Sequence, residues 1–407
     1  MMPKPVSLAL LPIVVALALS AAAARSASAD TEAKPSYSSN LQWRGSLNNS
    51  LVQFEQRRRG RVAFMGGSIT EMNGFRPRVC DYLRKRFPQT DFRFIDAGVA
   101  STCSTTGAFR LASDVLADGP VDLFFVEFAV NDDQDARHTR VECIRGMEGI
   151  IRHARRQNPN MDIVVVYFVN EGMLQTLQSG GVPLTIEAHE SVAAHYAVPT
   201  VNLARQVAGE ITAGTLTWQR YGGVHPAPLG NDLCARMIAE LLDRAWSKPP
   251  PPEAVLAAHP LPARRLDAFS YDSGRFIDPQ KAQVKHGWTR GIPDWKQLSG
   301  EKRSRFTSLP MFCATEPGAE ATLSFEGTAV GAYLLAGPDA GIVEASVDGG
   351  PFQPVNLYHS FSAGLHYPRT VMYGTELKPG QHTLTLRISA ETKSSGHAAR
   401  IMQFTAN

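Results

Sequence analysis

The stretch that decides the fold is RVAFMGGSIT, residues 61–70. Its apolar run, Val62 to Met65, stops at two glycines, which predicts a buried strand that ends in a tight turn. Apolar residues then recur at helical spacing over residues 79–87, so a helix is expected after the turn. Ser68 is therefore predicted to lie where a strand ends and a helix begins, the edge at which open α/β sheets bind ligands.

Two interpretations of Ser68 follow from this turn alone. A serine here exposes its hydroxyl beside peptide N–H groups, which are two requirements of nucleophilic catalysis. In the other interpretation the turn is an ordinary strand-to-helix connection and Ser68 is a helix N-cap. The short motif by itself favours the N-cap, and later stretches of the chain are needed to decide.

Strand-like and helix-like segments alternate from residue 61 to residue 246. Strands are predicted over residues 92–96, 121–130, 162–169 and 199–203, and helices over 107–117, 140–157, 184–196 and 229–246. This alternation predicts a parallel sheet of about five strands in a flavodoxin-like order, with helices on both faces. Right-handed crossovers then bring all the strand carboxyl ends to one edge, next to Ser68.

The pattern changes after the proline-rich stretch KPPPP, residues 248–252. Short alternating runs beyond it, separated by Gly, Pro and Asp, predict an antiparallel β-sandwich of jelly-roll type. Asp348-Gly349 between two of these runs is a hairpin signal. The expected domains are an α/β domain over residues 46–247, a linker over 248–264 and the sandwich over 265–407. Residues 265–320 fit neither pattern clearly.

Composition limits the classes of function. A chain of 407 residues with 43% hydrophobic and 19% charged residues is globular and long enough for two domains. The net charge of +3 gives no electrostatic case for a nucleic-acid partner. The sequence contains neither a phosphate-binding Gly-x-x-x-x-Gly-Lys nor a dinucleotide Gly-x-Gly-x-x-Gly, and no cofactor is expected.

The first 29 residues have the pattern of a signal peptide. Lys4 precedes a long apolar run, and Ala27-Ser28-Ala29 supplies small residues for cleavage before Asp30. We therefore expect an exported protein, periplasmic or extracellular, that has no membrane partner after cleavage. Residues 30–45 are polar and are predicted to be a flexible N-terminal segment. The five cysteines lack the paired spacing of a zinc site, and no metal is expected.

Four short blocks then decide the interpretation of Ser68. In chain order they are Gly66-Gly67-Ser68-Ile69-Thr70, Asp96-Ala97-Gly98, Ala129-Val130-Asn131-Asp132 and Gly222-Gly223-Val224-His225-Pro226. This order resembles the SGNH (GDSL-like) hydrolase superfamily, whose Ser, Gly, Asn and His lie in four such blocks. The resemblance covers roughly residues 60 to 246, and it implies an esterase fold and activity.

The resemblance also implies a role for each residue. Ser68 would be the nucleophile, and His225 would take its proton and return it to the leaving group. The backbone N–H groups of Ser68 and Gly98 and the side-chain amide of Asn131 would form the oxyanion hole. A side chain at position 98 would be expected to crowd the substrate carbonyl.

One position departs from the family pattern, because Gly222 stands where the family usually has an Asp that orients the catalytic His. Some members work with a Ser-His pair, and we expect an oxygen from elsewhere to contact the distal ring nitrogen of His225. The missing carboxylate also leaves open a non-catalytic carbohydrate-binding protein. An O-acyltransferase acting on a glycan would use the same residues.

Several other residues carry weaker expectations. Glu127 interrupts an apolar strand and needs a partner, for which Arg76 and Arg110 are candidates. Asp132 is a loop residue that could help to position Asn131. His189 and His195 are expected at or near the surface. The aromatic residues of the sandwich could stack on sugar rings or be core: Trp288, Trp295, Tyr358 and Tyr367.

The sheet order of the family also suggests a disulfide between Cys103 and Cys143. The loops that carry these residues would meet over the active-site edge, and a bond there would hold Gly98 and Asn131 at a fixed separation. Buried free thiols are the alternative.

Together these features predict an exported serine esterase. Export, the appended sandwich and the resemblance to carbohydrate esterases of this fold indicate a small acyl group, acetyl first, on a carbohydrate. The sandwich either binds sugar or only stabilises the protein, and the sequence does not decide between these.

Overall fold

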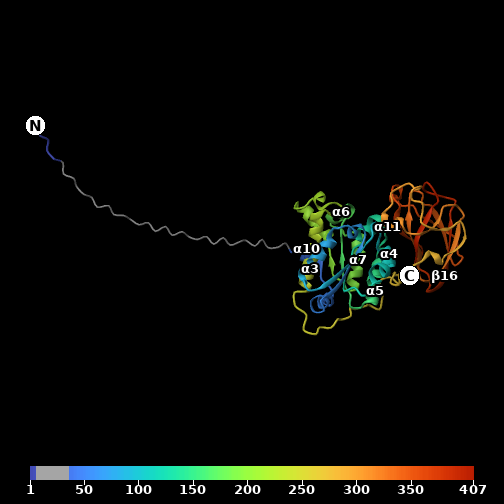
Figure 1. The fold of residues 1–407 in the computed structure, drawn as a ribbon, viewed down its shortest axis with the longest axis horizontal. Coiled ribbons are helices and arrows are strands. Elements are labelled where there is room, and N and C mark those ends of the chain that lie inside the picture. The colour runs from blue at the N-terminus through green and yellow to red at the C-terminus, as the bar shows by residue number, and fades with distance from the viewer. Residues whose placement is uncertain (6–35) are drawn as a thin grey trace. The chain divides into compact units, whose positions relative to one another are not determined.

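The parallel sheet predicted from the sequence is the centre of the N-terminal lobe. The computed structural model describes residues 1–5 and 36–407, so most of the predicted signal peptide lies outside the described residues (Figure 1). The strand order is β1-β6-β5-β4-β2-β3, and β2 to β6 are parallel, which confirms the predicted sheet. Their bounds are β2 Arg59–Gly66, β3 Asp91–Gly98, β4 Leu123–Val126, β5 Asp162–Val166 and β6 Thr200–Val201.

A sixth strand comes from a segment that the sequence did not assign to the sheet. Strand β1 (Leu41–Gln42) pairs antiparallel with β6, with Leu41 opposite Val201. Tyr37 and Leu41 are both buried in the core of this lobe. The expectation of a flexible segment was therefore wrong for residues 37–45. These two apolar side chains gain enough burial to hold the segment at the sheet edge.

Helices cover both faces of the sheet, as Figure 1 shows. Helix α3 (Phe75–Arg86) packs with α10 (Pro228–Ala245), and α5 (Arg140–Gln157) packs with α4 (Ser104–Leu111) and α7 (Leu184–His195). Helix α5 has its predicted bounds because Thr139 and Glu142 form a capping box at its start. Two further helices, α6 (Glu171–Gln178) and α8 (Leu203–Thr212), were not predicted. Among the described residues, no helix is both long enough and apolar enough to cross a membrane.

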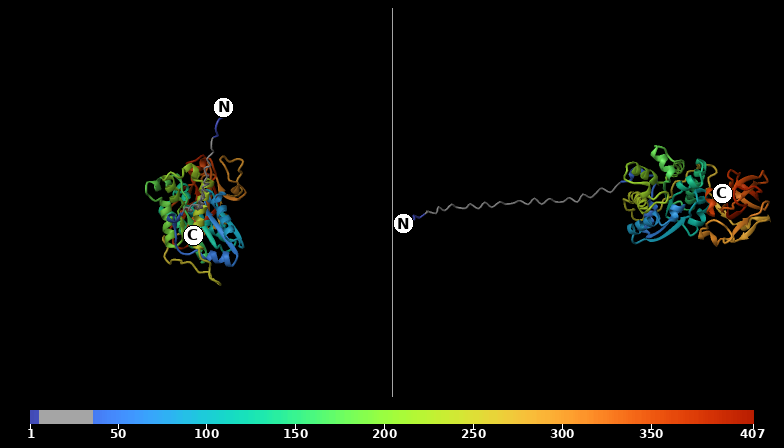
Figure 2. Two further views of the ribbon diagram at one scale, coloured as in Figure 1. Left: turned by 90° about the vertical axis from the view of Figure 1, so that its left-hand side faces the viewer. Right: turned by 90° about the horizontal axis from the view of Figure 1, so that it is seen from above.

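The C-terminal lobe is an antiparallel β-sandwich, as predicted (orange to red in Figures 1 and 2). One sheet contains β15-β12-β17-β10-β9 with β7 beside β17, and the other contains β14-β13-β16-β11-β8. The strands are β7 Arg275–Ile277, β8 Gln283–His286, β9 Thr289–Gly291, β10 Met311–Ala314, β11 Glu320–Gly327, β12 Val330–Ala336, β13 Ile342–Val347, β14 Gln353–Asn356, β15 Tyr367–Gly374, β16 Gly380–Ile388 and β17 Ala399–Ala406.

Local signals in this lobe behave as expected. Asp348 and Gly349 both have positive φ, 53° and 71°, which is the type I′ turn that joins β13 to β14. The unassigned residues 265–320 supply β7 to β10 and the short helix α11 (Ser304–Thr307). Alternate side chains of the strands meet between the two sheets and form a separate core.

The predicted linker is packed along the N-terminal lobe. Gln56 donates to the carbonyl of Pro251 at 2.6 Å, and His259 lies 2.7 Å from the buried carboxylate of Asp162. Tyr271 is buried in the core of the same lobe, so the chain reaches the sandwich only at β7. Polar side chains of the N-terminal lobe donate to carbonyl groups of the linker, and these hydrogen bonds hold the linker against the lobe.

Candidate active site

The structure brings Ser68 and His225 together, although 157 residues separate them in the chain. Ser68 is the first residue of the short helix α2 (Ser68–Glu71), which follows β2 directly. His225 lies in the loop before α10, and its Nε2 is 2.7 Å from Ser68 Oγ. A nucleophile and a base at this distance can transfer a proton along a direct hydrogen bond.

Asn131 lies directly beside the turn of Gly67 and Ser68, which is called the nucleophile turn below. A Cβ placed on Gly67 would be 2.1 Å from Asn131 Oδ1, so only glycine lets the amide approach the backbone next to Ser68. Ser68 begins a helix, and its N–H therefore has no acceptor within that helix. The amide of Asn131 thus lies beside the turn that carries the Ser68 N–H, and the two groups are candidate donors of an oxyanion hole.

The orientation of Asn131 is set by Asp135 and not by Asp132. Asn131 Nδ2 donates to Asp135 Oδ2 at 2.7 Å, one helical turn further on, which leaves its second N–H for a ligand. Asp132 instead accepts from the Ser104 N–H and hydroxyl, at 2.7 and 2.6 Å. The expectation that Asp132 could position Asn131 was wrong. The i, i+4 spacing of Asn131 and Asp135 was the signal for the correct residue.

Gly98 lies close to the turn, but its N–H already has an acceptor. It donates to Asp96 Oδ1 at 3.0 Å, so a substrate oxygen would have to replace that carboxylate. The reason for glycine also differs from the one expected. A Cβ at position 98 would lie 2.3 Å from the backbone nitrogen of Glu71, so glycine is needed for α2 to pack on β3.

The expected support for His225 is absent from the part of the chain that the structure describes. Its Nε2 faces Ser68, and no described oxygen lies within hydrogen-bond distance of Nδ1. The ring is exposed to solvent. Gly222 explains why no carboxylate stands there: its φ is +108°, and a Cβ would lie 2.0 Å from the backbone nitrogen of Ala227. The prediction of a substitute oxygen was wrong.

Glu127 is a functional candidate that was assigned the wrong partners. Its Oε1 accepts from Thr70 Oγ1 at 2.6 Å and from the Gly67 N–H at 3.1 Å. Neither predicted arginine bonds it: Arg76 pairs with Asp96, and Arg110 donates to backbone carbonyls. Complete burial raises the pKa of Glu127 to about 7, against the opposing effect of its two hydrogen bonds. The carboxyl group therefore binds both the nucleophile turn, at Gly67, and helix α2, at Thr70.

Asp132 is the centre of a buried polar network. Its Oδ2 lies 2.9 Å from His189 Nε2, and its Oδ1 lies 3.5 Å from His138 Nδ1. Burial alone would lower the pKa of His189, but hydrogen bonding to Asp132 and Cys143 raises it to about 9. The surface position expected for His189 was wrong, because this imidazole neutralises a carboxylate inside the protein.

The predicted disulfide is contradicted by the same network. Cys103 and Cys143 are buried free thiols, as are two of the other three cysteines. Cys103 lies in a group of three with Asp132 and His138, and Cys143 lies in a second group of three with Asp132 and His189. Both groups bring potential metal ligands within 4.8 Å of one another. The Asp132 oxygens are already saturated by Ser104 and His189, so these groups fit a polar core better than a metal site.

Of the four aromatic residues considered as sugar platforms, Trp288 and Tyr367 are buried, and Trp295 and Tyr358 are partly buried. Trp288 stacks on Phe312 in the sandwich core, with ring centroids 4.5 Å apart. Tyr367 stacks on His359 at 4.4 Å. Phe361, which the sequence did not single out, is 49% exposed beside these two rings. It is an exposed aromatic surface close to the loop of Asn131.

Comparisons with known proteins agree with the fold of both lobes. The model of the GDSL-like lipase/acylhydrolase family matches residues 64–233. The match lies within the α/β lobe, and it supports a carboxylic ester hydrolase as the class of protein.

Two solved structures are similar over both lobes. Both are of a two-domain esterase (CEX) active on acetylated mannans, and one was co-crystallized with mannopentaose. The latter has a TM-score of 0.73 at 20% identity and covers 91% of this chain and 97% of its own. The other has a TM-score of 0.70 at 22% identity and covers 91% and 98%. At these identities the similarity shows the two-lobed fold. No curated protein matches the chain.

Proposed function

We propose that this protein is an exported serine esterase that removes acetyl groups from a carbohydrate. The observation that carries the proposal is the 2.7 Å contact between Ser68 Oγ and His225 Nε2 at the carboxyl edge of the sheet. The order of the four sequence blocks and the family match support the same reaction class. Export rests on the signal-peptide pattern of residues 1–29.

The reaction has two steps. His225 takes the proton of Ser68 as the hydroxyl oxygen attacks the ester carbonyl, and then gives this proton to the leaving sugar oxygen. The acetyl-serine formed is hydrolysed by a water that His225 deprotonates in the same way. The carbonyl oxygen carries negative charge in both steps, and in this proposal the Ser68 N–H and the second N–H of the Asn131 amide donate to it. Gly98 N–H joins them if it releases Asp96.

The substrate class is supported by the relatives that share both lobes. A two-domain esterase of this architecture acts on acetylated mannans, so acetylated mannan is the first polysaccharide to test. The exposed ring of Phe361 offers a face for a sugar close to the Asn131 loop.

The test is hydrolysis of 4-nitrophenyl acetate and release of acetate from acetylated mannan by the wild type, Ser68→Ala and His225→Ala. We expect both variants to lose about 10⁴-fold or more in kcat. His195→Ala is the matched control, because His195 is a partly exposed histidine whose Nε2 donates to the carbonyl of Arg264 at 2.8 Å, and this variant should keep full activity. A folded Ser68→Ala protein with normal turnover would remove Ser68 from the mechanism. A wild type that binds mannan without hydrolysing either ester would instead favour the non-catalytic alternative.

A further inference from the structure

We propose that the sandwich lobe positions the oxyanion hole, and that Tyr367 is the positioning residue for Asn131, acting through Asp135. This inference rests on the proposed esterase function for its catalytic consequence. The contacts themselves come from two lobes that are distant in sequence, since residue 367 follows residue 135 by 232 positions.

The first step is the chain of hydrogen bonds from Tyr367 to Asn131. Tyr367 lies at the start of β15, and its hydroxyl has two acceptors, Asp135 Oδ1 at 3.0 Å and the carbonyl oxygen of Ser101 at 3.2 Å. The bond to the Asp135 carboxylate is the shorter of the two. The other oxygen of Asp135 accepts from Asn131 Nδ2 at 2.7 Å. All three side chains are buried, with exposed fractions of 2%, 8% and 2% for Tyr367, Asp135 and Asn131. A buried bond that breaks leaves an unsatisfied polar group, so this geometry is held firmly.

Asp135 is held at its backbone as well. His359 Nε2 lies 2.8 Å from the carbonyl oxygen of Asp135. The His359 ring is stacked on Tyr367 with only 8° between the planes. Two neighbouring side chains of the sandwich thus bind the side chain and the main chain of one residue. Asp135 is therefore restrained in both rotation and translation relative to the sandwich.

The same lobe contacts the opposite side of the site. Arg303 donates to the carbonyl of Ala100 and to Ser101 Oγ, both at 2.8 Å. Arg305 donates to the carbonyl of Gly98 at 3.2 Å and pairs with Glu71, the last residue of α2. Both arginines flank the start of α11. The loops of Gly98 and Asn131 are therefore both bound to the sandwich lobe, which is the role predicted for a disulfide between Cys103 and Cys143.

The chemical consequence concerns the direction of one N–H bond. The amide of Asn131 has two N–H groups, and fixing one on Asp135 fixes the direction of the other. An oxyanion-hole donor stabilises the transition state only if it is aimed before the reaction begins. Without Tyr367, Asp135 and the amide can rotate together. Binding of the ground-state ester should then change little, while the transition state loses a donor.

The experiment compares Tyr367→Phe with Tyr373→Phe in the full chain. Tyr373 lies on the same strand and its hydroxyl is buried, but this hydroxyl has no partner among the described residues. Tyr373→Phe therefore removes a buried hydroxyl, as Tyr367→Phe does, but it breaks no hydrogen bond between described residues. For Tyr367→Phe we expect kcat on 4-nitrophenyl acetate to fall about tenfold with KM unchanged, a fraction of the loss for deleting an oxyanion donor. Tyr373→Phe should match the wild type.

A double-mutant cycle separates positioning from a general structural effect. If Tyr367 acts through Asn131, Tyr367→Phe should have no further effect on kcat in an Asn131→Ala background. Equal losses in both backgrounds would overturn the proposal, and so would a kcat for Tyr367→Phe equal to that of Tyr373→Phe.

Hydrogen exchange of peptides spanning residues 128–138 gives a readout that does not depend on esterase activity. Exchange there should be faster in Tyr367→Phe than in Tyr373→Phe, and equal exchange would also contradict the proposal. Ser68→Ala, measured in parallel, reports on the proposed function alone. A normally active Ser68→Ala protein would remove the esterase mechanism and leave the exchange result to be judged independently.

Discussion

Gly222 shows how a single backbone conformation excludes a side chain from the site. Its φ of +108° disfavours any other residue, and a Cβ at this position would lie only 2.0 Å from the Ala227 nitrogen. The carboxylate that usually orients the histidine is therefore excluded by the turn itself. In the proposed mechanism His225 is oriented by its hydrogen bond to Ser68, without a carboxylate at position 222.

Restoring the family aspartate should consequently fail. We expect Gly222→Asp to lower the free energy of unfolding by about 1–3 kcal/mol, because of the strained φ and the contact with Ala227, without raising kcat. The measurement is urea unfolding together with ester hydrolysis. Gly223→Asp is the control, since Gly223 also has positive φ, but a Cβ there would meet no atom within 4 Å. A gain in kcat for Gly222→Asp would show that the turn can relax to accept the carboxylate.

Glu127 gives the nucleophile turn a pH-dependent stability. Its pKa is raised from 4.5 to about 7 in the folded protein, so between these values the folded state binds a proton that the unfolded state has lost. The contribution of this bound proton to the free energy of unfolding is complete below pH 4.5 and is lost as the pH rises toward 7. Glu127→Gln keeps the acceptor for Thr70 and Gly67 but does not titrate.

We therefore expect the melting temperature of the wild type to fall relative to that of Glu127→Gln as the pH rises from 4.5 to 7. Thermal unfolding of both proteins across this range measures the difference, in which other titrating groups cancel. A difference independent of pH would mean that Glu127 does not change protonation on unfolding in this range.

At the scale of elements, the sequence predicted the strands and helices that follow a strong local pattern. Helix α5 was predicted with its bounds, and β2 with its turn, because a capping box and a Gly-Gly pair mark them. The predicted strand 121–130 ends at Val126, where pairing stops and the chain turns toward Asn131. Apolar residues continue to 130 because the turn is also buried, so hydrophobicity alone could not mark the strand end.

Only the part of the site that is marked by a local sequence pattern was predicted. Ser68 and His225 lie in recognisable blocks, and the structure brings them together. The partners of Glu127, Asp132 and Asn131 were missed or wrong, because they depend on which side chains the tertiary fold places opposite one another. No local pattern connects Asp135 with Tyr367, which belongs to the other lobe.

The short helix η6 (Ser360–Ala363) is the element from which we expect contact with the sugar. Phe361 on this helix is half exposed, and its ring lies 5.6 Å from that of Tyr367. Phe361→Ala should raise KM for acetylated mannan by about threefold to thirtyfold, from the loss of one stacking contact, and leave 4-nitrophenyl acetate kinetics unchanged. Ile292→Ala is the control, since Ile292 is an exposed apolar residue of the same lobe. An equal change in both variants would argue against a specific sugar contact.

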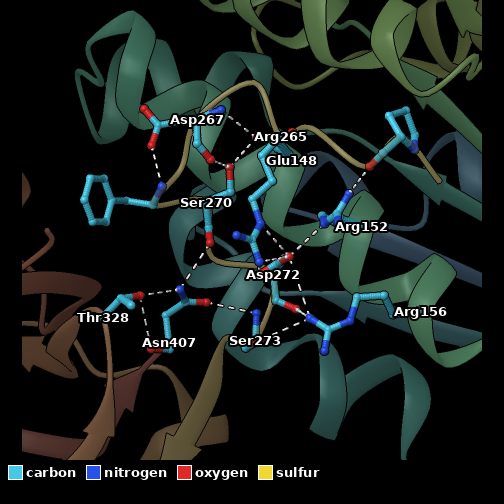
Figure 3. A network of polar contacts seen from close by, with 12 residues as sticks. Glu148, Arg152, Arg156, Arg265, Asp267, Ser270, Asp272, Ser273, Thr328 and Asn407 are labelled. Carbon is cyan, nitrogen blue, oxygen red and sulfur yellow. Dashed lines mark hydrogen bonds and ion pairs between the residues drawn. The ribbon is translucent and has the colours of Figure 1, made fainter. Parts of the chain in front are cut away.

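At the scale of the whole molecule, a network of charges joins the chain segment that enters the sandwich to α5 (Figure 3). The carboxylate of Asp272 is almost fully buried and pairs with Arg152 and Arg265, both at 2.9 Å. Glu148 accepts from the N–H groups of Leu266 and Asp267. Asn407 donates to the Ser270 carbonyl and so connects the end of β17 to the same segment.

Because of these contacts, we expect residues 37–407 to unfold in one calorimetric transition. Asp272→Asn should lower the free energy of unfolding by about 2–4 kcal/mol, since it leaves the largely buried guanidinium of Arg152 without its carboxylate. Asp118→Asn, which breaks an exposed pair with Arg61, should cost less than about 0.5 kcal/mol. Two separate transitions in the wild type would show that the lobes are energetically independent.

The contacts of Arg303, Arg305 and Tyr367 with the catalytic lobe have a consequence for protein engineering. Replacing the sandwich lobe would remove all of these contacts. In this protein three side chains of the sandwich lobe bind the loops that carry Gly98 and Asn131. A chimera would need to retain these three side chains on any replacement module, so substrate range and turnover cannot be tuned separately by exchanging whole cassettes.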